Sequence, residues 1–274
     1  KQDFVKNIKI YQDNLIEIPL ILPVSKKERQ KKTQIQIEKE YTLVNNSFDI
    51  PIKDQKYRPT CSAFTEIRAI EIQLKQVGKS YDLSEQYFYW ASKSDCQNET
   101  CNSKGSWVGH GYLHSKENAE YDIPMEYDCK YSDYSQKNNE TQIPLTSSCK
   151  NGQVKVSSFS YLKNLDEVIN SILKNKPVVA SVKLTPNFYE NTSLILDSEK
   201  NTGPSMDSHA QGHSILLIGI LKLPASLDEG QYCFVVANSW GEGWGVGGHA
   251  CLSEKWLINQ RQVNPFVVIN SIKF

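Results

Sequence analysis

The sequence predicts an α+β protein built of two lobes. Apolar residues recur at helical spacing between positions 61 and 90, which is typical of amphipathic helices. After residue 176 the pattern changes to short runs rich in Val, Ile and Phe, which favour strands. Helices followed by strands indicate a segregated layout, and 274 residues suffice for two lobes with a sizeable core.

The charge balance excludes some partners. Lys plus Arg number 31, as do Asp plus Glu, and the isoelectric point is near 7.1. This balance argues against nucleic acid or an anionic membrane as the main partner. No apolar run approaches the roughly 20 residues that span a bilayer. We expect a monomer, without a membrane or nucleic-acid partner.

Residues 1–44 differ from the rest of the chain, because they contain no cysteine. Residues 3–14 fit a short helix, and 15–24 with 33–38 fit a hairpin around the basic tip 25–32. The segment is either a pro-segment or an N-terminal extension of the main sheet. The residues alone leave both alternatives open.

The helices that follow carry start signals. Residues 61–75 form an apolar stripe after Pro59, with Thr60 as a candidate N-cap, and residues 82–90 form a second helix capped by Ser84. Residues 92–150 are mostly loop, with one short helix at 107–114, and a third long helix covers 164–176. The predicted strands are 178–182, 213–221, 232–237, 249–252 and 266–269.

The cysteine count is seven, which is odd. If Cys61 is a free nucleophile, the other six allow 15 pairings, and the sequence cannot choose among them. Neighbour order favours Cys96–Cys101, Cys129–Cys149 and Cys233–Cys251. The alternative is six buried thiols in a reducing compartment. Because these cysteines flank polar loops, we favour disulfides and a secreted, lysosome-like or vacuolar location.

Three residues stand in the chain order of a nucleophile, its base and the group that orients the base: Cys61, His213 and Asn238. Cys61 opens a predicted helix, whose N-terminus favours a thiolate. Each residue also has an ordinary explanation, as a buried cysteine, a core histidine and a turn asparagine. His110 and His114 have no third partner at ligand spacing, so we expect no metal and no cofactor.

Several sequence blocks together resemble the papain family of cysteine peptidases, in the family's order over residues ~50–274. The blocks are Gln55, Cys61-Ser62-Ala63-Phe64, Leu83-Ser84-Glu85-Gln86, Gly212-His213 and Asn238-Ser239-Trp240-Gly241 with Gly243-Trp244-Gly245 and Gly248. The resemblance implies a helical left lobe, an antiparallel β-barrel right lobe and an active site in the cleft. It places the peptidase domain at 45–274, with the left lobe at about 55–150 and the right lobe at about 151–274 plus 45–54.

The resemblance also implies roles. Cys61 would be the nucleophile, Gln55 and the Cys61 N–H the donors to the oxyanion, and His213 the base and then the acid. Asn238 would orient the imidazole and Trp240 would shield it. Gly105 and Ser106 would line the substrate channel.

The implied activity is hydrolysis of peptides or proteins through an acyl-enzyme. The nucleophile loop departs from the family pattern at Arg58, Pro59 and Ser62. Arg58 stands where a structural cysteine is usual. The alternatives are an acyl transferase or deamidase that acts on a partner protein, and a binding module without catalysis.

Overall fold

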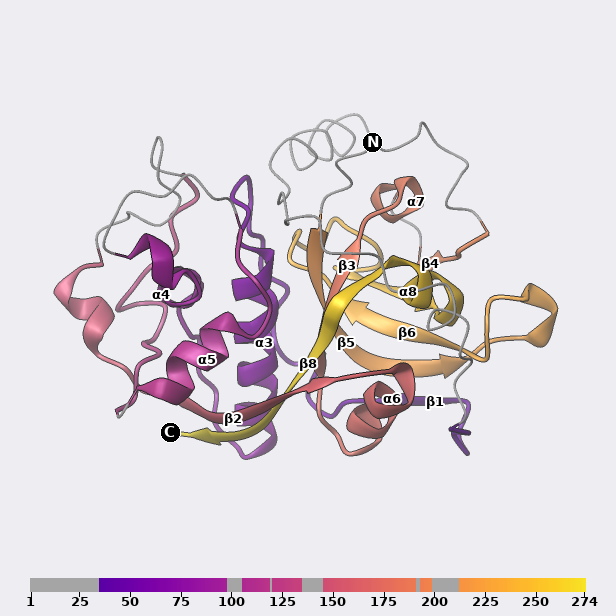
Figure 1. Cartoon of the computed structure of the whole chain (residues 1–274), viewed down its shortest axis with the longest axis horizontal. Coiled ribbons are helices and arrows are strands. Elements are labelled where there is room, and N and C mark those ends of the chain that lie inside the picture. Colours follow the sequence, from indigo (N-terminus) through magenta and orange to yellow (C-terminus); the bar gives the residue numbers. More distant parts are fainter. Residues whose placement is uncertain (1–34, 98–104, 119, 135–144, 191–192, 199–211) are drawn as a thin grey trace.

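The computed structural model describes residues 35–97, 105–118, 120–134, 145–190, 193–198 and 212–274 (Figure 1). The predicted helix at 3–14 and the hairpin strand at 15–24 lie outside these residues. Figure 1 shows the helices of residues 61–117 on the left and most of the strands on the right, where further helices lie beside them. The prediction of an α+β protein with two segregated lobes is therefore confirmed.

The helical lobe contains α3 (Cys61–Gln76), α4 (Glu85–Ala91) and α5 (His110–Glu117). Two short 3-10 helices, η1 (Ser94–Cys96) and η2 (Ser147–Lys150), complete it. Helix α3 contacts both α4 and strand β5 (Gly212–Lys222) of the other lobe. Residues on nearly all faces of α3 are buried, so this helix lies between the two lobes.

One predicted helix cap is confirmed and another is wrong. The Ser84 hydroxyl accepts a hydrogen bond from the Tyr87 N–H at 3.0 Å, as an N-cap should. Thr60 makes no side-chain cap on α3. Its hydroxyl lies 2.8 Å from the Tyr131 hydroxyl, so a tertiary contact has replaced the local one.

The strand lobe is one eight-stranded sheet in the order β2-β8-β3-β5-β6-β7-β4, with β1 paired to β5. The strand bounds are β1 (Tyr41–Leu43), β2 (Lys155–Leu162), β3 (Val178–Lys183), β4 (Leu194–Ile195), β5 as above, β6 (Tyr232–Ala237), β7 (His249–Ser253) and β8 (Arg261–Lys273). All pairs are antiparallel except β4 with β7.

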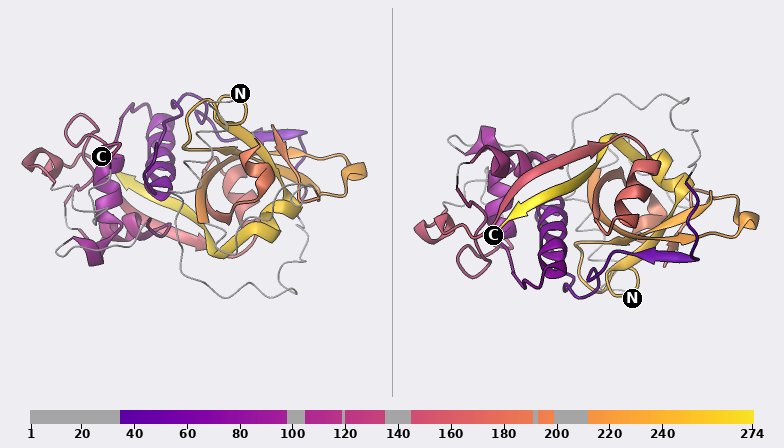
Figure 2. Two further views of the ribbon diagram at one scale, coloured as in Figure 1. Left: turned by 90° about the horizontal axis from the view of Figure 1, so that it is seen from above. Right: turned by 90° about the horizontal axis from the view of Figure 1, so that it is seen from below.

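The sheet is not the closed antiparallel barrel that we expected. Among the described residues no pairing joins the β2 end of the sheet to the β4 end. One side of strand β5 is shared between two partners: its first half pairs with β3, whereas Gly219 to Leu221 pair with β1. The ribbon of β2 and β8 leaves the strand lobe and packs along α5 (Figure 2).

Three further helices flank the sheet: α6 (Leu165–Leu173), α7 (Pro186–Tyr189) and α8 (Glu254–Gln260). Helix α6 is the predicted third long helix, capped by Asn164 through the Glu167 N–H at 3.0 Å. Helices α7 and α8 were not predicted, because they are too short for a periodic pattern to stand out. Another short 3-10 helix, η3 (Ala225–Leu227), follows β5.

The described part of the N-terminal segment belongs to the sheet. Ile37 and Val44 are buried in the core, and β1 pairs with β5. The strand predicted at 33–38 is absent from residues 35–38, where the backbone of Ile35 and Ile37 hydrogen-bonds to the Tyr232 hydroxyl instead of to a strand, and residues 33–34 lie outside the described part. Residues 35–44 are thus an extension of the core.

Two of the three predicted disulfides are confirmed. Cys129–Cys149 joins a turn of the helical lobe to η2, and Cys233–Cys251 joins β6 to β7. The predicted partner of Cys96, Cys101, lies outside the described residues. Cys61 is the free cysteine in the described part of the chain. Over those same residues, no helix is long and apolar enough to cross a membrane.

Candidate active site

The candidate nucleophile lies where the lobes meet. Cys61 is the first residue of α3 and is only 1 % exposed. The Thr65 hydroxyl lies 2.8 Å from the Cys61 carbonyl oxygen and 3.0 Å from the Ser214 carbonyl oxygen. The Ser214 backbone partly opposes the rise in the pKa of Cys61 that burial causes. The first turn of α3 is therefore attached to β5 next to His213.

His213 and Asn238 are in direct contact. His213 Nε2 lies 2.7 Å from Asn238 Oδ1, and both residues are buried, on β5 and directly after β6. The Asn238 oxygen also accepts the Ser239 N–H at 2.8 Å. His213 Nδ1 has no hydrogen-bond partner among the described residues. Asn238 thus holds His213 Nε2, whereas Nδ1 is available. The next residue, Ser214, is linked through the Thr65 hydroxyl to the first turn of α3.

Burial keeps the thiol and the imidazole neutral in this state. Desolvation raises the pKa of Cys61 to about 12 and lowers the pKa of His213 to about 4, although the bond to Asn238 partly opposes the second shift. An imidazolium beside a thiolate stabilises both charges. Proton transfer between them therefore requires closer contact than this state has, because the two side chains form no hydrogen bond with each other.

Aromatic side chains cover the His213–Asn238 contact. The Trp240 ring lies 4.7 Å from the His213 ring, and Tyr189 stacks on Trp240 at 5.6 Å. Phe188 meets His213 edge-on at 5.9 Å. Trp240 therefore packs against the His213 ring, and its shielding role stays a prediction. The sequence pattern missed Phe188 and Tyr189, because α7 was not predicted.

Gln55 is held from both lobes. Its Nε2 donates to the Arg58 carbonyl oxygen at 2.8 Å, and its Oε1 accepts from the Ser239 hydroxyl at 2.6 Å. Its backbone N–H donates to the Ser239 carbonyl oxygen at 2.8 Å. An amide NH₂ carries two hydrogens, so one N–H of Gln55 remains for a ligand. The residue after Asn238 thereby fixes the candidate oxyanion donor.

Gly105 and Ser106 lie beside the start of α3. The Ser106 hydroxyl hydrogen-bonds to the Ser62 hydroxyl, one residue after Cys61. The Gly105 N–H donates to the Tyr89 hydroxyl at 3.1 Å, with a left-handed φ of 74° that suits glycine. Gly105 and Ser106 thus lie next to α4 and the first turn of α3.

Glu66 is a buried carboxyl group that the sequence analysis missed. It lies on α3 with 0 % exposure, and its Oε1 accepts the Gly109 N–H, whereas its Oε2 has no partner among the described residues. Desolvation raises the pKa of Glu66 well above 4.5. A charge in the middle of an otherwise apolar stripe was the available signal.

Replacing Glu66 with glutamine is expected to stabilise the protein at neutral and alkaline pH. Above about pH 4.5 the unfolded chain releases this proton while the folded chain keeps it, so stability falls as pH rises towards the folded pKa. Glutamine keeps the acceptor for Gly109 and carries no titrating proton. We expect a Tm about 2 to 4 °C higher at pH 8 for each kcal/mol gained, and a difference that shrinks towards pH 4.5.

The control for this prediction is Glu117→Gln, an exposed glutamate on α5. Scanning calorimetry at several pH values measures both variants against the parent protein. A Glu66→Gln variant with no gain in Tm at pH 8 would contradict a protonated Glu66.

The chain is similar to known cysteine proteases in sequence. A family model described as "Papain family cysteine protease" matches residues 39–266. "Cysteine proteinase 3" of Dictyostelium discoideum is 26 % identical over 208 residues, which are 73 % of this chain and 54 % of the relative. Human "Cathepsin L2" is 24 % identical over 212 residues, or 74 % of this chain and 57 % of the relative. The chain thus spans just over half the length of these curated relatives.

Solved structures share the fold. Xylellain, a cysteine protease from Xylella fastidiosa, aligns with a TM-score of 0.66 and 13 % identity over 95 % of this chain and 98 % of its own. Digestive procathepsin L 3 of Tenebrio molitor aligns with a TM-score of 0.63 and 17 % identity over 97 % of this chain and 78 % of its own. At these identities the likeness concerns the fold alone.

Proposed function

Because the chain belongs to the papain family of cysteine proteases, we propose that it hydrolyses peptide bonds in peptides or proteins through Cys61, His213 and Asn238. The observation that carries the proposal is the His213–Asn238 contact of 2.7 Å. The residue after His213, Ser214, is linked through the Thr65 hydroxyl to the first turn of the helix that Cys61 opens. The contact with Asn238 leaves His213 Nδ1 for the thiol.

The reaction would proceed in two halves. His213 takes the thiol proton, and the Cys61 sulfur attacks the carbonyl carbon, so that the carbonyl π electrons move to the oxygen. The second N–H of Gln55 and the Cys61 N–H stabilise this oxyanion. His213 then gives its proton to the leaving amine, and an acyl-enzyme remains. Water, deprotonated by His213, hydrolyses the thioester and returns the proton to Cys61 through His213.

Neighbouring residues support these steps. Asn238 accepts from His213 Nε2, which selects the ring orientation in which Nδ1 faces away from the amide. Trp240 and Tyr189 exclude water from that bond. Gly105 and Ser106, attached to Tyr89 and Ser62, form an edge along which the substrate backbone can lie.

The proposed peptidase has two lobes and acts in an oxidising compartment. Residues 45–274 would be the peptidase domain, with a helical lobe at about 55–150 and a strand lobe at about 151–274 plus 45–54. The pairing of β1 with β5 supports assigning residues 35–44 to the same body. Two disulfides favour an oxidising compartment, so we propose secretion or a lysosome-like vacuole, as a monomer.

The test is mass spectrometry of the protein after brief exposure to a limiting amount of an epoxysuccinyl peptide. We expect the label on Cys61, and we expect fluorogenic peptide amides to yield new peptide ends. Cys61→Ala should abolish both results. A mass shift on an intact acceptor protein without peptide cleavage would favour a transferase or deamidase. Absence of labelling and cleavage in a folded protein would favour a binding module.

A further inference from the structure

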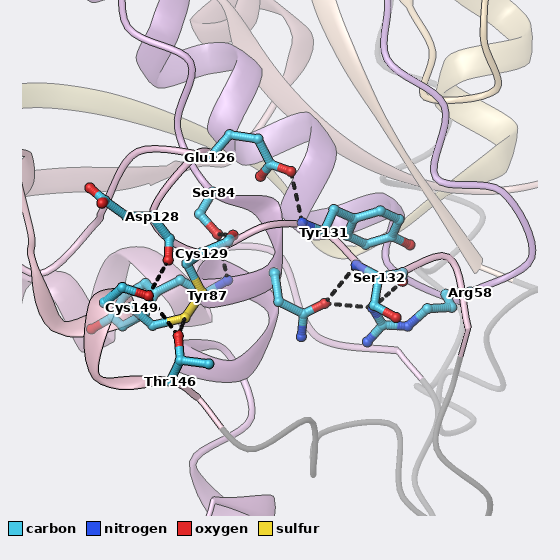
Figure 3. The surroundings of a disulfide bond; sticks show 12 residues. Arg58, Ser84, Tyr87, Glu126, Asp128, Cys129, Tyr131, Ser132, Thr146 and Cys149 are labelled. Atoms are coloured by element: carbon cyan, nitrogen blue, oxygen red, sulfur yellow. Dashed lines mark hydrogen bonds between the residues drawn. A yellow bond between two sulfur atoms is a disulfide. The ribbon is translucent and has the colours of Figure 1, made fainter.

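Arg58 is a cation buried beneath the loop that leads to Cys61. It is 1 % exposed, and its Nη1 donates to Gln86 Oε1 at 2.7 Å and to the Ser132 carbonyl oxygen at 2.8 Å. Its guanidinium carbon lies 5.4 Å from the centre of the Tyr89 ring and 5.1 Å from that of Tyr131. Figure 3 shows Arg58 reaching Ser132 beside Tyr131. Burial of a cation this deep is costly unless its partners are fixed.

The backbone of Arg58 holds the candidate oxyanion donor. Its carbonyl oxygen accepts from Gln55 Nε2 at 2.8 Å and from the Thr60 N–H at 2.9 Å. Ser239 holds the other end of the Gln55 amide. With one hydrogen of the NH₂ bound to Arg58, the direction of the remaining N–H depends on where the Arg58 carbonyl lies.

Tyr131 hydrogen-bonds to both ends of the segment from Gln55 to Thr60. Its hydroxyl donates to the Gln55 carbonyl oxygen at 2.8 Å and accepts from the Thr60 hydroxyl at 2.8 Å. The Tyr131 N–H donates to Glu126 Oε1 at 2.7 Å, and the Cys129–Cys149 disulfide lies close by in the chain (Figure 3). The Tyr131–Ser132 segment, which Arg58 contacts, is therefore held in place by groups outside the loop that leads to Cys61.

We propose that Arg58 is a positioning residue, which with Tyr131 aims the remaining N–H of Gln55 at the oxyanion. The inference rests on the proposed function, because the role of Gln55 is part of it. A planar guanidinium suits this task, since it can donate along fixed directions while it lies between two rings. The compact ammonium of lysine cannot reproduce this arrangement.

The effect should fall on kcat, because an oxyanion donor acts mainly in the transition state. We expect Arg58→Gln to lower kcat about 10- to 100-fold, with KM within about threefold, because small misplacements at a reacting centre have effects of this size. We expect Arg58→Lys to have a higher Tm than Arg58→Gln but an equally low kcat.

A double-mutant cycle separates positioning from general destabilisation. We expect Gln55→Ala to lower kcat about 100-fold, and the added Arg58→Gln to change it by less than about threefold, since the residue through which Arg58 acts is gone. Tyr131→Phe, which keeps the ring, should lower kcat about threefold to tenfold and show the same dependence on Gln55. If Arg58→Gln does not fold, the Tyr131→Phe variant still tests the inference.

The matched control is Arg68→Gln. Arg68, on α3, is also buried, and it donates to the carbonyl oxygens of Ser47, Ile50 and Pro51 in the segment before Gln55. It should lower Tm with kcat within about twofold. Unchanged kcat in Tyr131→Phe and Arg58→Gln, or effects that multiply with Gln55→Ala, would overturn the inference alone. A parent protein that neither cleaves peptides nor labels at Cys61 would overturn the proposed function and this inference with it.

Discussion

Replacing His213 with alanine is expected to lower kcat/KM for peptide amides by about 10⁴-fold or more, the size of loss seen when the base of such a unit is removed. Burial raises the pKa of the Cys61 thiol to about 12, so without an imidazole the sulfur stays protonated at neutral pH. The leaving amine also loses its proton donor. The measurement is hydrolysis of a fluorogenic peptide, together with the rate of Cys61 alkylation, between pH 5 and 9.

His114→Ala is the matched control for this variant. Burial lowers the pKa of His114 as it does that of His213, but His114 faces Trp90 and Asp122 in the helical lobe. We expect its kcat/KM within about threefold of the parent. A His213→Ala protein that is folded and retains a tenth of the parent activity would show that His213 is not the base.

Replacing Lys53 with methionine is expected to destabilise the protein by about 3 to 5 kcal/mol, the cost of leaving buried charges without their partner. Lys53 Nζ lies 3.2 Å from Glu71 Oε1 and 2.6 Å from Glu85 Oε1, and both carboxyl groups are buried. A third contact, with Asp82 at 2.6 Å, is more exposed. This cluster joins the loop before Gln55 to α3 and α4.

The loss should depend on pH. Desolvation raises the pKa of Glu85 to about 8, and Lys53 opposes this shift. Without Lys53 the pKa values of Glu71 and Glu85 rise further, so the folded variant holds protons that its unfolded chain releases above about pH 4.5. The destabilisation is therefore expected to be larger at pH 8 than at pH 5 in urea unfolding.

Lys56→Met is the control, because Lys56 pairs with Asp54 at 2.9 Å in a partly exposed position. Such a pair contributes about 0 to 1 kcal/mol. Adding Glu71→Gln and Glu85→Gln to Lys53→Met should recover part of the stability. Equal losses for the two lysine variants, or a Lys53→Met loss that does not change with pH, would contradict the buried-charge explanation.

The sequence predicted elements whose signals are local. Helix α3 has a clear apolar period, and α4 has Ser84 at its start. Strand β2 was missed because it is rich in polar residues and only partly buried, so its alternation is weak. The sheet stays open between β2 and β4 instead of closing into a barrel, and the sharing of one side of β5 by β1 and β3 depends on a register that the sequence does not contain.

The candidate site divides in the same way. Cys61, His213 and Asn238 stood out through their flanking motifs, and the structure brings His213 and Asn238 into contact. Ser239 belongs to a block that the sequence analysis named, but its bond to Gln55 was not predicted, and Tyr131 was not singled out. Ser239 lies 184 residues away from Gln55 and Tyr131 lies 76 away. A serine or tyrosine of this kind has no spacing that reveals its partner before the chain is folded.

The ribbon of β2 and β8 has a consequence for how the protein is made. Strand β2 pairs with β8 along most of its length, and β8 follows every other described element in the chain. Strand β2, which contacts α5, thus lacks its partner strand until β8 has been synthesised. Pairing over so long a sequence separation slows folding. We therefore expect nascent chains that lack β8 to remain dependent on chaperones, even when every residue of the candidate site is already present.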